Sequence, residues 1–179
     1  KLPPPGAALG GNIGGSLLSK IGAIKPDDWV VLELSSAQLH WLSAGAGYAS
    51  AKGFSPSIAV LTNLTPNHVD WHGELGHYVQ SKHTIVKHQL AGGSAGAGDV
   101  FITVYDPERN LALYHWPQPE AATIHLHPSD PATGPWPVAP HLRVRVPGAH
   151  NRLNGRVAGT AVVAALRRER SMHGQHPDA

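Results

Sequence analysis

Residues 58–87 carry the side chains whose types and spacing could do chemistry. Their sequence, IAVLTNLTPNHVDWHGELGHYVQSKHTIVK, passes from a short apolar run to a polar loop with His68, Asp70 and His72, and then to a helical pattern. Imidazoles and carboxylates suit divalent metal ions. A loop between a strand and a helix is also where α/β enzymes place functional groups. This stretch is therefore the first candidate site.

The predicted helix of this stretch has a lysine on its apolar face. The apolar stripe runs through Leu75, Val79, Val86 and Leu90, and Lys82 takes the stripe position seven residues after Leu75. Burying an ammonium group is unfavourable unless the group is paired or chemically changed. Lys82 is thus predicted to point inward and to require a partner or a modification.

A second candidate group follows the apolar run WVVL at residues 29–32, which predicts a strand buried on both faces. Glu33 comes directly after this run, and Ser35 and Ser36 can cap the next helix. A carboxylate at the end of a buried strand can serve as a metal or phosphate-side ligand. A solvated strand end has the same sequence, so both interpretations stay open.

The glycine-rich segment GGNIGG, residues 10–15, predicts a turn that opens a short helix from about Ser16. Such a turn lets the backbone approach a ligand, and the helix N-terminus offers free N–H groups to an anion. No Gly-Lys-Ser/Thr follows, so the segment is not a P-loop. A simple turn is the competing interpretation.

Further elements must position these groups. Apolar, β-branched runs predict strands over residues 100–105, 111–116, 122–127 and 142–146, of which the first three are spaced for an antiparallel hairpin region. A helical stripe predicts a helix over residues 151–170. Flexible or Pro-rich loops are expected at 92–98 and 128–140.

Two asparagines lie one turn apart at the start of the last predicted helix. Asn151 and Asn154 could both address one ligand from the helix N-terminus. In the alternative interpretation Asn151 only caps the helix.

The composition narrows the classes of protein. A chain of 179 residues predicts one domain, and a net charge of +2 with scattered basic residues gives no nucleic-acid footprint. Without cysteine, any metal ligands must be His or carboxylate side chains. No apolar run reaches the roughly 20 residues that span a bilayer, so no membrane partner is expected. The first residue is Lys1, which indicates a piece of a longer protein.

The segments GGNIGG, VLELSSAQL, AVLTNLTPNHVDWHG, YVQSK and VPGAHNRLN occur here in an order and spacing that resemble the Mur ligases. The ELSS-x-QL signature resembles the D-glutamate-adding branch of that family most closely. The resemblance implies an α/β fold with a mostly parallel sheet, flanked by helices, and a small antiparallel strand region. Residues 1–179 would form part of the central ATP-binding domain, without the N-terminal UDP-binding and C-terminal domains.

The resemblance also implies roles for residues of the first four segments. Asn12 would contact the UDP-muramoyl substrate, and Ser35 and Ser36 would line the muramoyl-alanine side. Glu33 and His68 would bind magnesium. Lys82 matches the lysine that family members carbamylate, which would make it an anionic magnesium ligand and explain its inward direction.

The last segment would bind the nucleotide, since Asn151, Asn154 and His150 match the motif beside the adenine. The implied cofactors are ATP and Mg²⁺, and the implied substrates are UDP-N-acetylmuramoyl-L-alanine and D-glutamate. In the family reaction ATP phosphorylates the substrate carboxylate, and the amino acid then attacks the acyl phosphate. The resemblance further implies a monomeric, cytoplasmic protein of peptidoglycan biosynthesis.

Departures from the family pattern shape the expected activity. The family has a strand and a G-x-x-G-K-[ST] loop before the GGNIG turn, and this sequence contains no such loop. The isolated chain is therefore expected to be inactive. Ala37 stands at the usual position of Phe, and Trp71 at that of Arg. Two alternatives remain: a nucleotide- or UDP-sugar-binding domain without catalysis, and a hydrolase in which His68, His72 and His77 share a metal.

Overall fold

The computed structural model describes residues 6–43, 53–91, 98–104, 121–126 and 145–172. The predicted strand at 111–116 and the predicted loop at 128–140 lie outside these residues, as does nearly all of the loop at 92–98. The described elements, in chain order, are β1 (Ala7–Gly11), η1 (Leu18–Ala23), β2 (Trp29–Glu33), α1 (Ser36–Trp41), β3 (Ile58–Leu61), α2 (Val69–His72), α3 (Leu75–Lys87), β4 (Val100–Val104), β5 (Ala122–Leu126) and α4 (Ala149–Met172).

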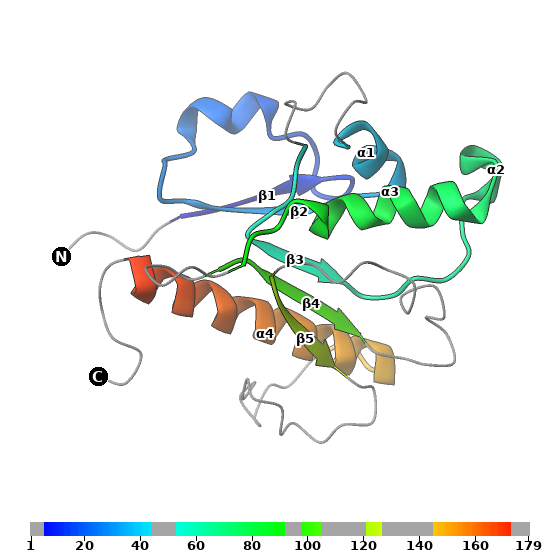
Figure 1. The fold of residues 1–179 in the computed structure, drawn as a ribbon. Helices are drawn as coiled ribbons and strands as arrows, with labels where there is room; N and C mark the ends of the chain where they lie inside the picture. Colours follow the sequence, from blue (N-terminus) through cyan, green and yellow to red (C-terminus); the bar gives the residue numbers. More distant parts are fainter. Residues whose placement is uncertain (1–5, 44–52, 92–97, 105–120, 127–144, 173–179) are drawn as a thin grey trace.

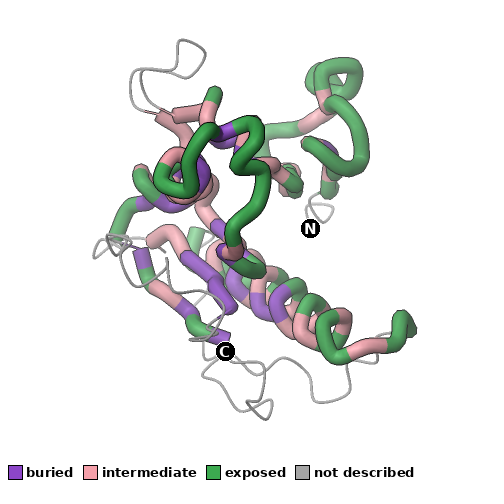
Figure 2. The backbone as a smooth tube through the Cα atoms, turned by 90° about the vertical axis from the view of Figure 1, so that its right-hand side faces the viewer, coloured by how far each residue is buried: buried purple, intermediate pink, exposed green. Residues whose placement is uncertain are grey.

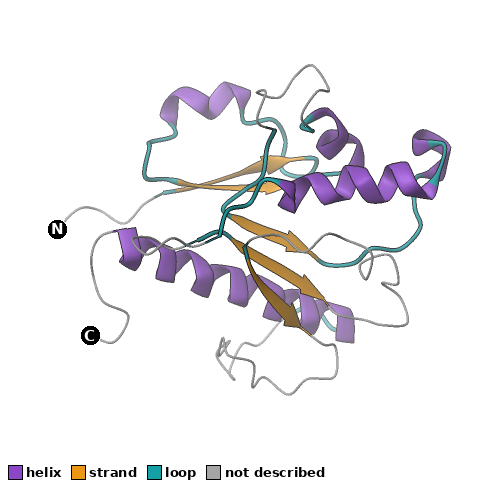
Figure 3. Cartoon of the chain, viewed as in Figure 1, coloured by secondary structure: helices purple, strands orange, loops and turns teal. Residues whose placement is uncertain are grey.

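Strands β3, β4 and β5 form a parallel sheet between two helices (Figures 1 and 3). The side chains of β4 contribute to a hydrophobic cluster on each face of the sheet, because successive residues of a strand point to opposite faces. Phe101 packs with residues of β3 and α3, whereas Ile102 and Val104 pack with residues of β5 and with Val157 of α4. The α/β class expected from the sequence is confirmed.

The expected antiparallel pairing is wrong for β4 and β5. These strands pair in parallel, with Val100 opposite Ala122 and Val104 opposite Leu126. The chain between them, residues 105–121, is long enough for the crossover that a parallel pair requires, whereas an antiparallel pair needs only a short turn. All strand pairs among the described residues are parallel.

Strands β1 and β2 form a separate parallel pair, with Ala7 opposite Trp29 and Gly11 opposite Glu33. The expectation that β2 is buried on both faces is wrong: Val30, Val31 and Leu32 are 43%, 53% and 40% exposed. Within the described chain β2 has only β1 as a strand partner, so its apolar residues are not enclosed. Figure 2 shows the buried residues, in purple, gathered where the long helix α4 lies beside the strands.

The buried face of α3 differs from the predicted stripe. Leu75 is 41% exposed and Leu90, beyond the helix, is 66% exposed, whereas Tyr78 and Val86 are buried. Lys82 lies one turn after Tyr78, so it is still on the buried face. The predicted helix from about Ser16 begins later, at Leu18, and is a 3₁₀ helix.

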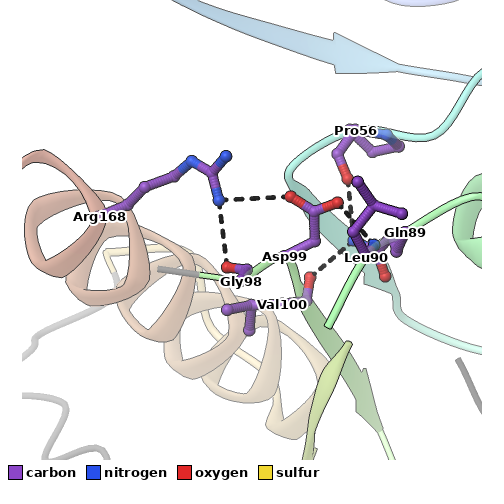
Figure 4. A network of polar contacts seen from close by, with 7 residues as sticks. All are labelled: Pro56, Gln89, Leu90, Gly98, Asp99, Val100 and Arg168. Carbon is purple, nitrogen blue, oxygen red and sulfur yellow. Dashed lines mark hydrogen bonds and ion pairs between the residues drawn. The ribbon is translucent and has the colours of Figure 1, made fainter. Parts of the chain in front are cut away.

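The predicted C-terminal helix is confirmed as α4, and polar contacts near its end hold it against the sheet (Figure 4). The Arg168 guanidinium lies 3.3 Å from Asp99 Oδ1 and donates to Gly98 O at 3.1 Å. The other Asp99 oxygen, Oδ2, accepts from Leu90 N. Gln89 Nε2 donates to Pro56 O and Val100 O, so it links the starts of β3 and β4.

The segment before α4 is described only in part. Arg145 and Val146, the end of the strand predicted over 142–146, lie in a bend, and the rest of that segment is outside the described residues.

In the described part of the chain, no helix has the length and apolar character needed to span a membrane.

Candidate functional site

The carboxyl ends of β1 and β2 bring Asn12 and Glu33 together. Asn12 N donates to Glu33 O at 2.7 Å, one residue past the pairing of Gly11 with Glu33. Gly11 has φ +115°, and a Cβ at this position would lie 2.1 Å from Glu33 O. The close approach of the two strand ends therefore depends on glycine, and it places an amide and a carboxylate at one edge of the sheet.

Both serines after Glu33 have structural hydrogen bonds. Ser35 Oγ accepts from Gln38 N, and Gln38 Oε1 accepts from Ser35 N, which forms a capping box at the start of α1. Ser36 is buried, and its hydroxyl lies 2.9 Å from His72 Nε2. The capping that the sequence indicated is confirmed, and the substrate contacts of these serines stay predictions.

Lys82 lies on α3, and the charge of Glu33 influences it. Its side chain is half-buried, and its ammonium lies 5.8 Å from the centre of the Tyr78 ring. Burial lowers the pKa of Lys82, and the negative charge of Glu33 acts in the opposite direction. Lys82 forms no ion pair with another of the described residues. The partial burial of Lys82 agrees with the expected inward direction, and its role at a site with Glu33 stays a prediction.

His68 precedes α2 in a left-handed conformation, with φ 51° and ψ 33°. It is the only non-glycine residue of positive φ in the described segments. Such a conformation is uncommon outside glycine and recurs at functional sites. His68 is exposed and lies in the connection between β3 and α2. Its role as a metal ligand stays a prediction.

A three-histidine metal site is not found. No group of three or more His, Cys, Asp or Glu residues in the described segments is arranged to hold a metal ion. His72 instead bonds to Ser36 and faces His77, with 3.1 Å between their Nδ1 atoms. The hydrolase alternative, in which His68, His72 and His77 share a metal, is therefore not supported.

The described side chains fit the expected magnesium ion only with a modified lysine. Glu33 offers carboxylate oxygen, the donor that Mg²⁺ prefers, His68 offers only an imidazole nitrogen, and an unmodified ammonium cannot ligate a cation. A carbamate on Lys82 would supply a third, anionic oxygen ligand. The lowered pKa of Lys82 favours the neutral amine that reacts with carbon dioxide.

The start of α4 carries the expected nucleotide-binding residues. Asn151 Nδ2 donates to Pro147 O at 2.9 Å, so this amide closes the turn before the helix. His150 and Asn154 are exposed. Figure 1 shows this end of α4 near the arrowheads of β4 and β5, hence at the carboxyl side of the sheet. The contacts of these residues with a nucleotide stay predictions.

Sequence reasoning grouped His72 with His77 but missed His40, which completes a cluster of three imidazoles. His77 Nε2 lies 3.0 Å from His40 Nδ1, and the ring of His77 also contacts His72. The five-residue spacing of His72 and His77 spans the break between α2 and α3, so no helical period connects them. His40 comes from α1, and no local pattern places it there.

Comparisons with known proteins agree with the resemblance. The Mur ligase middle domain family matches residues 17–127. The chain is 49% identical over 83 residues to the UDP-N-acetylmuramoylalanine–D-glutamate ligase of Acetivibrio thermocellus. The matched stretch covers 46% of this chain and 16% of that relative. The corresponding ligase of Clostridium acetobutylicum is 44% identical over 84 residues, or 47% and 16% of the two chains. The matched stretch thus spans about a sixth of these relatives.

Proposed function

Because the chain belongs to the Mur ligase family, we propose that it is the central part of an ATP-dependent ligase that joins D-glutamate to UDP-N-acetylmuramoyl-L-alanine. The observation that carries the proposal is the half-buried Lys82 on α3, whose pKa is lowered by burial and raised in part by the charge of Glu33 at the end of β2. Relatives that share 44–49% identity over the matched stretch bear the name of this D-glutamate ligase.

The proposed chemistry needs charge neutralisation more than a protein nucleophile. Glu33, His68 and carbamylated Lys82 would hold magnesium, which offsets negative charge on transferring phosphoryl groups. Asn12 lies beside Glu33, where its amide can contact the acceptor substrate. The asparagines at the start of α4 would contact the adenine of ATP. The proposal also includes a monomeric, cytoplasmic protein.

The 179 residues alone are proposed to be inactive. They contain no G-x-x-G-K-[ST] sequence, whose lysine and backbone amides would hold the β- and γ-phosphates. ATP hydrolysis by the purified 179-residue chain that is lost in Lys82→Ala would contradict this part of the proposal.

The ligase activity is tested in the complete protein that contains this chain. Phosphate release from ATP should require both UDP-N-acetylmuramoyl-L-alanine and D-glutamate, and L-glutamate should not replace D-glutamate. Glu33→Gln keeps the size of the side chain but removes its charge, so it should lower kcat by 10²-fold or more, on the order expected for one electrostatic contact to a reacting group. Binding of the UDP-sugar without phosphate release would instead favour the binding domain without catalysis.

A further inference from the structure

Three imidazoles from three helices meet at a place that the proposed reaction does not use. They are His40 of α1, His72 of α2 and His77 of α3. His77 Nε2 lies 3.0 Å from His40 Nδ1, and His77 Nδ1 lies 3.1 Å from His72 Nδ1. The indole of Trp71, 47% exposed, contacts all three rings.

The hydrogen bonds assign the tautomer of the central ring. His77 Nδ1 lies 3.1 Å from the main-chain oxygen of His72, and a carbonyl oxygen can only accept. His77 Nδ1 therefore carries the hydrogen. In the neutral ring this leaves the lone pair on Nε2, so the hydrogen of the His40–His77 hydrogen bond is on His40 Nδ1. An ion bound between the two nitrogens would replace this hydrogen, and neutral His40 would then carry its hydrogen on Nε2.

The separation of these two nitrogens suits a shared metal ion. Two imidazole nitrogens bound at the usual Zn–N length of about 2.0–2.1 Å, with an angle between 90° and the tetrahedral value, lie about 2.8–3.4 Å apart. The His40–His77 distance of 3.0 Å falls in this range. A metal-bound imidazole usually donates its other N–H to a carbonyl or carboxylate, as His77 does to the His72 carbonyl.

We propose that His40 Nδ1 and His77 Nε2 bind one divalent ion of the Zn²⁺, Ni²⁺ or Cu²⁺ class, with water in the remaining positions. His72 is not a ligand of this ion, because its ring faces the opposite nitrogen of His77 and bonds to Ser36. Both ligand side chains are only partly buried, which leaves room for bound water. The ion would link α1 to α3, and we refer to this proposed His40–His77 metal site as the clamp.

The two donor nitrogens determine which divalent ions the proposed site would prefer. Imidazole nitrogens favour Cu²⁺, Ni²⁺ and Zn²⁺, whereas Mg²⁺ prefers oxygen ligands. The clamp is therefore chemically distinct from the magnesium site proposed at Glu33 and Lys82. It does not depend on the ligase activity, so either proposal can fail without the other.

Copper binding to the protein tests the clamp at neutral pH. Electron paramagnetic resonance of the wild-type protein with one equivalent of Cu²⁺ should show two equatorial imidazole nitrogens. By calorimetry, His40→Gln and His77→Gln should each weaken Cu²⁺ and Zn²⁺ binding by about tenfold or more, because each removes one arm of a two-point attachment. The double variant should lose little beyond either single variant.

A matched control separates the clamp from the other histidines of the chain. His83→Gln makes the same change on the same helix α3, and it should leave the affinity unchanged. Zn²⁺ should raise the melting temperature of the wild type and of His83→Gln, but not of His40→Gln, and Mg²⁺ should not replace Zn²⁺. Circular dichroism without metal checks that each variant folds.

Two results would overturn the clamp. One is a wild-type copper spectrum with a single imidazole nitrogen, which is informative even if a variant does not fold. The other is equal metal affinity for the wild type, His40→Gln and His77→Gln, which would mean that the two rings share only a hydrogen bond.

Discussion

Replacing Gly11 with alanine probes the junction that brings Asn12 to Glu33. Gly11 has φ +115°, a conformation that side-chain-bearing residues rarely adopt, and an added Cβ would lie 2.1 Å from Glu33 O. That oxygen also accepts the hydrogen bond from Asn12 N at 2.7 Å. Because the obstacle is main chain of the paired strand, a side-chain rotation cannot relieve it.

The expected destabilisation combines two contributions. Backbone strain of this kind is worth about 1–3 kcal/mol, and loss of the Asn12–Glu33 hydrogen bond adds about 0.5–1.5 kcal/mol. Their sum is about 1.5–4.5 kcal/mol. For a chain of this size it corresponds to a melting temperature lower by about 3–18 °C. The separated strand ends should also weaken whatever ligand Asn12 and Glu33 bind together.

Two other glycines provide matched controls in urea and thermal unfolding. Gly15 has φ +81° but open space around its Cβ position, so Gly15→Ala should show strain alone, about 1 kcal/mol. Gly22 has open space and no positive φ, so Gly22→Ala should change stability by no more than about 1 kcal/mol. If Gly11→Ala is as stable as Gly22→Ala, the β1–β2 register described above is wrong.

Three further predictions concern the helices beside the site. Leu39→Ala, at a side chain 1% exposed, should lower the free energy of unfolding by about 2–5 kcal/mol in urea titrations; a loss below 1 kcal/mol would contradict this packing. Ser35→Ala should lower it by about 0.5–2 kcal/mol, and Ser35→Asp, another capping residue, should restore most of the loss. The pKa of His72 is lowered, mainly by burial and then by the nearby charges of His77, His40 and His68, so the free energy of unfolding should fall as the pH drops below about 6.5. His72→Gln, if it folds, should reduce this dependence of the free energy of unfolding on pH. An unchanged dependence would contradict the prediction.

Local sequence patterns predicted the elements that carry the site. The apolar run before Glu33 forms β2, Ser35 caps α1, and the stripe after Asn151 forms α4. Each of these depends on neighbours within about one helical turn or one strand, which the sequence displays directly. The same local patterns placed the candidate residues at strand ends and helix starts.

The errors concern properties that distant parts of the chain decide. The apolar run of β2 predicts burial, yet burial depends on which elements cover the strand, and Val31 is 53% exposed. The pairing of β4 with β5 depends on the path of residues 105–121, not on the two strands themselves. The exposure of Leu75 similarly reflects how α3 sits on the sheet.

The imidazole cluster could not be predicted for a related reason. His40 and His77 are 37 residues apart and meet only because α1 packs against α3. Neither residue belongs to a recognisable ligand spacing. Lys82 was easier to identify, because a lysine among the inward positions of a helix is unusual by itself.

The state of the Lys82 side chain tests the central claim most directly. The measurement is the carbon-13 NMR spectrum of the complete protein with magnesium, equilibrated with ¹³C-labelled bicarbonate. A carbamate signal should be present in the wild type and absent in Lys82→Arg, because arginine keeps its charge and does not react with carbon dioxide. A wild-type spectrum without that signal, from protein that still ligates, would contradict the proposed magnesium site.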